Sequence, residues 1–104
     1  MKVSFRQSGG FAGLVKGVDL DSSNMAADQG QQLEKLAAAS GIQGSTTARL
    51  QVARDLMQYD IRIEQNSQVS KLSFDDKTVP PAVQPLLTYL KSQAHPMPLD
   101  SAIR

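Results

Sequence analysis

Two short segments hold the residues whose types and spacing could support chemistry. The first is the run Ser8-Gly9-Gly10-Phe11-Ala12-Gly13, in which one aromatic residue stands among three glycines. Glycine-rich segments form mobile or tightly turned loops, so Phe11 is interpreted as an aromatic anchor that enters a pocket on a partner protein. The alternative is that the Phe11 ring folds back and closes the end of the hydrophobic core.

The same run does not fit a phosphate-binding loop. Its glycines depart from the dinucleotide-binding spacing, and the run is expected to join two antiparallel strands rather than a strand and a helix. A phosphate site needs a helix N-terminus behind the loop, so this chemistry is set aside.

The second segment is the acidic pair Asp75-Asp76, which precedes Lys77 and Pro80. Such a pair favours a turn at the surface, where both carboxylates are solvated. The alternative is that one carboxylate meets a cation or a metal ion held by a partner. An enzyme with paired carboxylates would also need a pocket and a second group with an evident role, and the sequence indicates neither.

The sequence holds little else from which an enzyme could be built. Its only histidine, His95, stands beside Pro96 in a segment expected to be unstructured, whereas a working base needs a fixed position. No Walker loop, G-x-S-x-G nucleophile elbow or H-E-x-x-H helix is present. The chain has no cysteine, which excludes disulfides, thiolate catalysis and thiolate metal sites. We therefore expect a protein that is not an enzyme and has no cofactor or metal of its own.

Composition and charge narrow the classes of partner. Eleven Lys and Arg residues stand against ten Asp and Glu residues, and they form no basic stripe of the kind that binds nucleic acid. Two Tyr and three Phe are too few for a base-stacking platform. The first residues lack the apolar segment of a signal peptide, and no apolar run approaches the ~18 residues of a membrane span. We expect a cytoplasmic monomer that contacts neither nucleic acid nor membrane.

Alternating apolar residues predict a β-hairpin around the glycine-rich run. Val3 and Phe5 alternate with polar residues before the run, and a second strand over about residues 14–20 places Val18 and Leu20 on one face. The run itself would form the tip that joins the two strands.

A second pair of strands is predicted in the second half of the chain. Residues 57–64 alternate strictly between apolar and polar side chains, which is typical of an antiparallel sheet with one wet face. A turn at residues 66–68 leads into a fourth strand over about residues 69–75, with Leu72 and Phe74 on its inner face.

Two amphipathic helices complete the prediction. The first is expected to begin with a cap at residues 22–24 and to end at Gly41, with Leu33 and Leu36 on its apolar stripe. The second is expected to begin near Pro80-Pro81, because proline is favoured in the first turn of a helix. Its apolar stripe is Val83, Leu86, Leu87 and Leu90. The pattern over residues 42–55 leaves open whether they form a short helix or an irregular connection.

The order ββαββα predicts an α+β fold in which two helices pack on one face of a four-stranded antiparallel sheet. Residues 1–93 would form this single domain, and residues 94–104, with two prolines and little periodicity, would form a disordered tail. Alternating chain direction would bring the glycine-rich run, the 41–56 connection and the Asp75–Thr78 turn to one end of the molecule. Asp21 would lie at the other end.

Several of these segments together are similar to a known family. The run Arg6-Gln7-Ser8-Gly9-Gly10-Phe11-Ala12-Gly13 and the following Val18-Asp19-Leu20-Asp21-Ser22 resemble the emfourin family, as do the Tyr59–Ile63 strand and the Phe74-Asp75-Asp76 stretch. The resemblance covers about residues 2–92, and Ser-Gly-Gly-Phe-Ala-Gly is its most specific part. It implies a bacterial, reversible and competitive inhibitor that blocks the active-site cleft of protealysin-like zinc metallopeptidases of the thermolysin family.

The resemblance also implies a role for the glycine-rich run. Phe11, with Leu14 near it, would fill the hydrophobic pocket of a thermolysin-like cleft. The protease-binding loop would consist of Gly9, Gly10, Phe11, Ala12, Gly13 and Leu14. The alternative is an interaction module, such as an adaptor or an antitoxin-like partner, that uses the same end of the molecule without contacting a metal.

A zinc ligand from the inhibitor is the second implied element. A carboxylate oxygen would take the open position of the target's zinc ion in place of the catalytic water, at about 2.0–2.2 Å. Asp75 or Asp76 is the first choice, because both are expected beside the glycine-rich run. Asp55 is the second choice and Asp21 the third.

Overall fold

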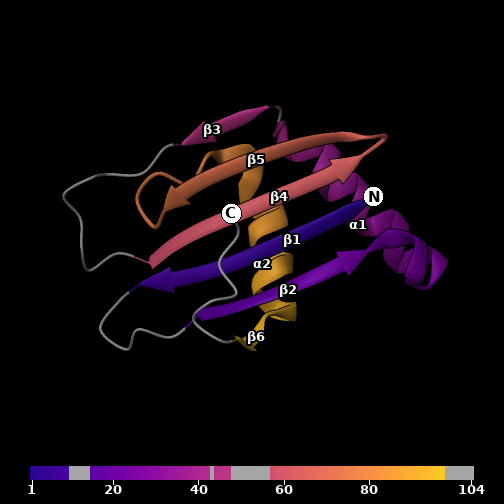
Figure 1. The fold of residues 1–104 in the computed structure, drawn as a ribbon, viewed down its shortest axis with the longest axis horizontal. Coiled ribbons are helices and arrows are strands. Elements are labelled where there is room, and N and C mark those ends of the chain that lie inside the picture. Colours follow the sequence, from indigo (N-terminus) through magenta and orange to yellow (C-terminus); the bar gives the residue numbers. More distant parts are fainter. Residues whose placement is uncertain (10–14, 43, 48–56, 98–104) are drawn as a thin grey trace.

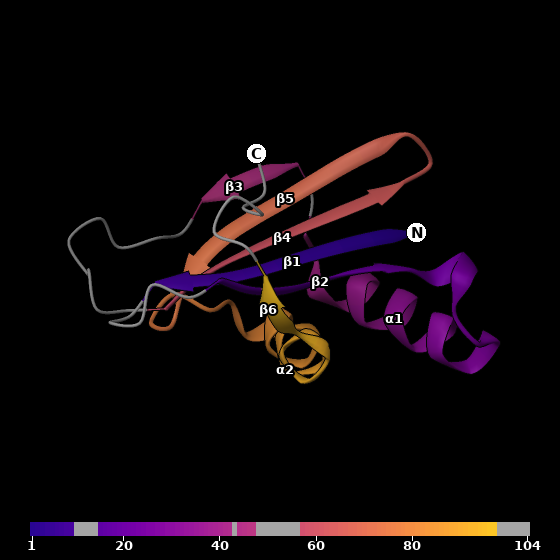
Figure 2. The same cartoon turned by 60° about the horizontal axis from the view of Figure 1, so that its bottom comes forward.

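The computed structural model describes residues 1–9, 15–42, 44–47 and 57–97. Within them, six strands form one sheet. Two helices lie against the same face of this sheet (Figure 1 and Figure 2). The predicted α+β architecture with helices on one face is confirmed, whereas the predicted number of strands is wrong.

Four antiparallel strands form the centre of the sheet. They are β1 (Lys2–Gly9), β2 (Val15–Asp21), β4 (Met57–Gln65) and β5 (Gln68–Asp75). β1 lies between β2 and β4, and β4 pairs with β5 on its other side. These are the four strands that the alternation of apolar and polar residues predicts.

Two further strands account for the difference from the prediction. β3 (Ser45–Thr47) pairs in parallel with β5, and the amide of Lys71 donates to the carbonyl oxygen of Gly44 at 2.6 Å. β6 (His95–Met97) pairs antiparallel with β2. The prediction that these residues belong to a disordered tail is therefore wrong. Both are edge strands of three residues, which is too short for alternation to reveal them. Residues 98–104 lie outside the described residues.

The first helix begins later than its sequence suggests. The Asp21 carboxylate accepts hydrogen bonds from the amide and hydroxyl of Ser23, at 3.0 and 2.7 Å. This carboxylate therefore caps η1 (Ser22–Asn24), a single 3-10 turn. The long helix α1 (Ala27–Ser40) starts after it and has no side-chain cap. Gly41, with a φ of 70°, ends the helix in the left-handed conformation as predicted.

The second helix starts near Pro80 as predicted, but its first turn is again a 3-10 turn. This turn, η2 (Pro81–Val83), runs into α2 (Gln84–Gln93). The buried residues of the two helices meet the inner face of the central strands to form one core. That core consists of Val3, Phe5, Val18, Leu33, Ala37, Tyr59, Ile61, Ile63, Leu72, Phe74, Val83, Leu86, Leu87 and Leu90.

The face of the sheet opposite the helices carries an ion pair between β1 and β2. The guanidinium of Arg6 donates to both carboxylate oxygens of Asp19, at 2.9 and 3.1 Å. Gly17 leaves room for this contact, because a Cβ there would lie 2.8 Å from Cδ of Arg6. The hydrogen bond from Arg6 holds the pKa of Asp19 below its usual value of 3.8.

Gly30→Ala is expected to destabilise the protein, although alanine is the better helix former by about 1 kcal/mol. The added Cβ would lie 2.8 Å from the carbonyl oxygen of Ser22, which cannot yield without moving η1. We expect the free energy of unfolding, measured by urea denaturation, to fall by about 1–2 kcal/mol. Gln31→Ala, at an exposed position of the same helix, is the control and should change it by less than about 0.5 kcal/mol. A gain in stability for Gly30→Ala would contradict this account of the packing.

Asp19→Asn is expected to lower the melting temperature at neutral pH and to lose this effect in acid. The pKa of Asp19 is depressed in the folded state, so its stabilising contribution is present above the usual pKa of 3.8 and disappears as pH falls through the folded value. Thermal melts of the wild type and of Asp19→Asn at pH 7 and pH 3 would measure the difference in melting temperature. An equal difference in melting temperature at the two pH values would show that the ion pair does not stabilise the fold.

Candidate functional site

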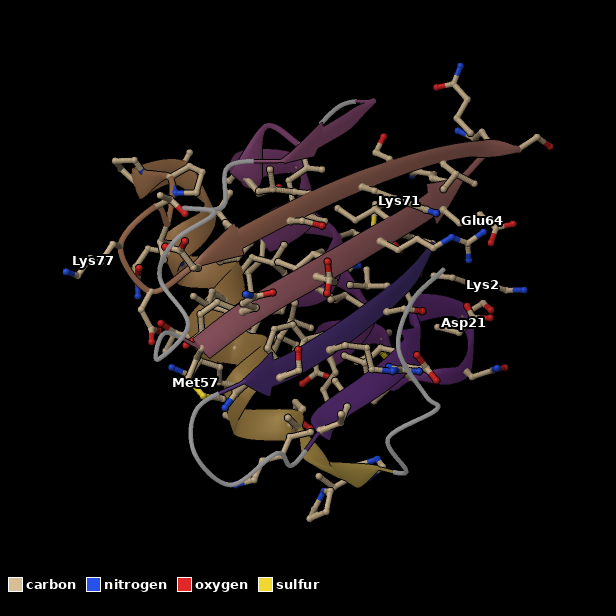
Figure 3. All side chains as sticks on the ribbon, turned by 60° about the vertical axis from the view of Figure 1, so that its left-hand side comes forward. Lys2, Asp21, Met57, Glu64, Lys71 and Lys77 are labelled. Atoms are coloured by element: carbon tan, nitrogen blue, oxygen red, sulfur yellow. The ribbon has the colours of Figure 1, made fainter. Side chains whose placement is uncertain are left out.

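Strand register brings the glycine-rich run and the acidic turn to one end of the sheet. Gly9, the last residue of β1, pairs with Met57, the first residue of β4. The next residue of β4, Gln58, pairs with Asp75 at the end of β5. Figure 3 shows Met57 and Lys77 at this end, away from Lys2 and Asp21. The prediction is therefore confirmed for Gly9 and the acidic turn. It is wrong for the start of the 41–56 connection, because Gly41 and Ile42 lie beside Met1 and Gln65 at the opposite end of the sheet.

The described residues border the predicted protease-binding loop but do not include its centre. Gly9 has a φ of 103°, a backbone conformation that favours glycine and turns the chain out of β1. Val15, where β2 begins, is buried. Gly10, Phe11, Ala12, Gly13 and Leu14 lie outside the described residues, and so does Asp55.

Asp75 is the buried member of the acidic pair. Its side chain accepts hydrogen bonds from the amide of Lys77 at 2.9 Å and from the hydroxyl of Thr78 at 3.0 Å. Its own amide donates to the Thr78 hydroxyl at 2.9 Å. The residue is only 2% exposed. Asp75 therefore shapes the turn after β5 and presents almost no surface to another molecule.

Asp76 is exposed and lies against the start of β4. One carboxylate oxygen, Oδ2, accepts a hydrogen bond from the amide of Met57 at 3.1 Å, and the other, Oδ1, accepts one from the hydroxyl of Tyr59. The Asp76 amide donates to the Met57 carbonyl oxygen at 3.2 Å. Because each carboxylate oxygen has two lone pairs, both retain acceptor capacity toward an outside ligand.

Tyr59 connects this carboxylate to the core. Its ring stacks on Phe5 at a centroid distance of 6.1 Å and lies 5.3 Å from the ring of Phe74. On the helix side, Nζ of Lys91 lies 3.5 Å from the Tyr59 hydroxyl and 5.4 Å from the ring centroid. Burial, followed by the hydrogen bond to Asp76, raises the pKa of Tyr59 well above its usual value. The phenol therefore stays protonated and donates to Asp76.

The alternation over residues 57–64 places Met57 and Tyr59 on one face of a strand and does not reveal their contacts with Asp76. A signal was available for Tyr59, since a buried tyrosine needs a partner for its hydroxyl where phenylalanine does not. No comparable signal exists for Met57, which acts through its backbone amide and carbonyl.

Asp21, the third choice for a zinc ligand, lies at the opposite end of the sheet. It pairs with Lys2 in the β1–β2 ladder, and its carboxylate caps η1. Hydrogen bonds from Ser23 lower the pKa of Asp21. This position separates Asp21 from both the acidic turn and the end of β1.

Away from the acidic turn, the described residues form cavities lined by both polar and apolar side chains. An open cavity of about 370 Å³ lies near the end of α1 and is lined by residues that include Ala37, Ile42 and Ile63. Within the described ranges, no three His, Asp or Glu side chains come together as a metal site would require. None of the helices in the same part of the chain has the length and apolarity needed to cross a bilayer.

Comparison with known proteins identifies the family. The family model described as Emfourin matches residues 5–91, which include Gly9, Met57, Tyr59 and both residues of the acidic pair. Neither the curated proteins nor the solved structures contain a match to the chain. Because the matched span covers most of the chain, this protein belongs to the Emfourin family, a family of protease inhibitors.

Proposed function

We propose that the protein is a reversible, competitive inhibitor of protealysin-like zinc metallopeptidases of the thermolysin family. The observation that supports this most directly is the exposed Asp76 carboxylate at the end of the sheet where β1 leads into the glycine-rich run. An aromatic side chain and a carboxylate from this end would meet the two features of a thermolysin-like cleft, its hydrophobic pocket and its zinc ion.

Asp76 is a better zinc ligand than Asp75 on physical grounds. A ligand for a metal held by another protein must be accessible, and Asp75 is 2% exposed and bonded within its own turn. Asp76 is exposed, and hydrogen bonds from Met57 and Tyr59 orient its carboxylate. Metal-binding carboxylates commonly accept such supporting hydrogen bonds. In the proposed complex, an oxygen of Asp76 takes the zinc position that water occupies during catalysis.

Phe11 supplies the apolar part of the proposed contact. Each side chain that is immobilised on binding costs about 0.5–1.5 kcal/mol. A central aromatic anchor and a metal contact together are needed to outweigh this cost. Leu14 extends the same apolar surface in the proposal.

Titration of a thermolysin-family peptidase with the purified protein, followed by cleavage of a short peptide substrate, tests the proposal. Competitive inhibition would raise KM and leave kcat unchanged. A protein that captures the peptidase equally well with and without a zinc chelator, and does not inhibit it, would instead be a metal-independent interaction module. No effect on cleavage at any concentration would refute the inhibitor assignment.

Phe11→Ala is expected to weaken inhibition by about 2 kcal/mol or more, which corresponds to roughly a 30-fold higher inhibition constant. The reason is the loss of the aromatic anchor from the hydrophobic pocket. Val69→Ala is a suitable control, because Val69 is an exposed apolar residue near the opposite end of β5. If folded Phe11→Ala inhibits within twofold of the wild type, Phe11 is not the anchor.

Substitution of Asp76 is expected to weaken inhibition, whereas substitution of Asp75 is expected to lower stability. Asp76→Asn should raise the inhibition constant at least tenfold, because an amide is a much poorer zinc ligand than a carboxylate. Asp75→Asn should mainly lower the free energy of unfolding, by about 1–3 kcal/mol, because it disrupts the hydrogen bonds within the buried turn. Inhibition assays and urea denaturation of both variants would measure this. Equal inhibition by Asp76→Asn and the wild type would exclude Asp76 as the ligand.

A further inference from the structure

A chain of three side chains leads from helix α2 to the exposed acidic turn. Nζ of Lys91 lies 3.5 Å from the hydroxyl oxygen of Tyr59, and that hydroxyl donates to Oδ1 of Asp76. The three residues come from α2, β4 and the turn after β5, so they join elements that are separated in the sequence.

The members of this chain differ in how firmly they are held. Tyr59 is 2% exposed, and its ring is packed between Phe5 and Phe74, so the core sets the position of its hydroxyl. Asp76 stands on an exposed turn, where an unsupported carboxylate would sample several rotamers. Hydrogen bonds from the Tyr59 hydroxyl and the Met57 amide hold the Asp76 carboxylate in one of these rotamers.

We propose that Tyr59, assisted by Lys91, is a positioning residue that sets the Asp76 carboxylate for the zinc ion of the target peptidase. This inference rests on the proposed function and adds a residue that makes no contact with the target itself. Buried Tyr59 sets the strength of inhibition through the orientation of an exposed ligand.

The chemistry of the contact suits this role. The phenol is a neutral donor, so it orients the carboxylate and leaves its negative charge available to the metal. The Lys91 ammonium beside the phenol oxygen and over the ring favours donation by the hydroxyl toward Asp76, since hydrogen bonds in a chain polarise one another. The Met57 amide completes the arrangement from the backbone, where only a substitution by proline would remove it.

Tyr59→Phe is the test, because it removes the hydroxyl and keeps the packed ring. We expect the inhibition constant for a thermolysin-family peptidase to rise about tenfold, the lower end of the range for partners of metal ligands. Tyr89→Phe is the matched control, since Tyr89 is the only other tyrosine and its residue packs against the core from α2. This control should stay within twofold of the wild type.

A double-mutant cycle separates positioning from a general structural role. If Tyr59 acts through Asp76, adding Tyr59→Phe to Asp76→Asn should cause no further rise in the inhibition constant. If Tyr59 only supports the fold, its effect should be the same in both backgrounds, and the inference would be wrong.

Spectroscopy of a cobalt-substituted peptidase reports on the metal directly. Saturation with the wild-type protein should shift the visible cobalt absorption, because a carboxylate replaces water at the metal. Saturation with Tyr59→Phe should give a smaller shift, since the carboxylate is bound in only part of the complexes. A shift identical to that of the wild type would overturn the proposed role of Tyr59.

The remaining outcomes are also decisive. If the wild-type protein does not inhibit, the proposed function fails and takes this inference with it. If the wild type inhibits and Tyr59→Phe is equally strong, only the inference fails. Should Tyr59→Phe not fold, Lys91→Met replaces it. In the wild-type background this variant should raise the inhibition constant roughly threefold, the scale of a cation–π contact. In the Asp76→Asn background it should cause no further rise. Equal weakening in both backgrounds would contradict the proposal.

Discussion

The register between β1, β4 and β5 is the constraint on which the rest of the structure depends. It places Gly9 opposite Met57 and Gln58 opposite Asp75, so three distant parts of the chain end side by side. The same register directs Phe5, Tyr59 and Phe74 to one face. Because a shift of one residue would turn a strand's whole apolar set toward solvent, burial of the core and assembly of the site are a single event.

Tyr59 is where core and site meet. Its ring packs between Phe5 and Phe74 in the core, and its hydroxyl donates a hydrogen bond to Asp76 at the surface. A domain of this size has only about 5–15 kcal/mol of stability, so a separate buried network to orient a surface ligand would be costly. Using one core residue for both purposes avoids that cost, and the packing of the Tyr59 ring fixes the position of its hydroxyl.

Much of the fold could be predicted because it follows from local patterns. Residues 57–64 alternate strictly, and Gly41 stands where a helix end needs a left-handed residue. The three-residue strands β3 and β6 could not be predicted, because pairing with longer neighbours creates them. The same limit applies to the acidic pair. Adjacent aspartates look equivalent in a sequence, and only the fold of the turn buries Asp75 and leaves Asp76 exposed.

The distinction between these two aspartates bears on how a protein can inhibit a peptidase without becoming its substrate. In the proposed complex, the group at the zinc is a side-chain oxygen of Asp76, and no peptide bond of the inhibitor takes the place of the scissile bond. That oxygen also occupies the position of the attacking water, so the nucleophile is missing while the complex persists. Two hydrogen bonds join Asp76 to Met57. The Asp76 amide donates to the Met57 carbonyl oxygen, and the Asp76 carboxylate accepts from the Met57 amide. A turn held in this way resists the extended conformation that a cleft needs for cleavage, which favours inhibition over hydrolysis.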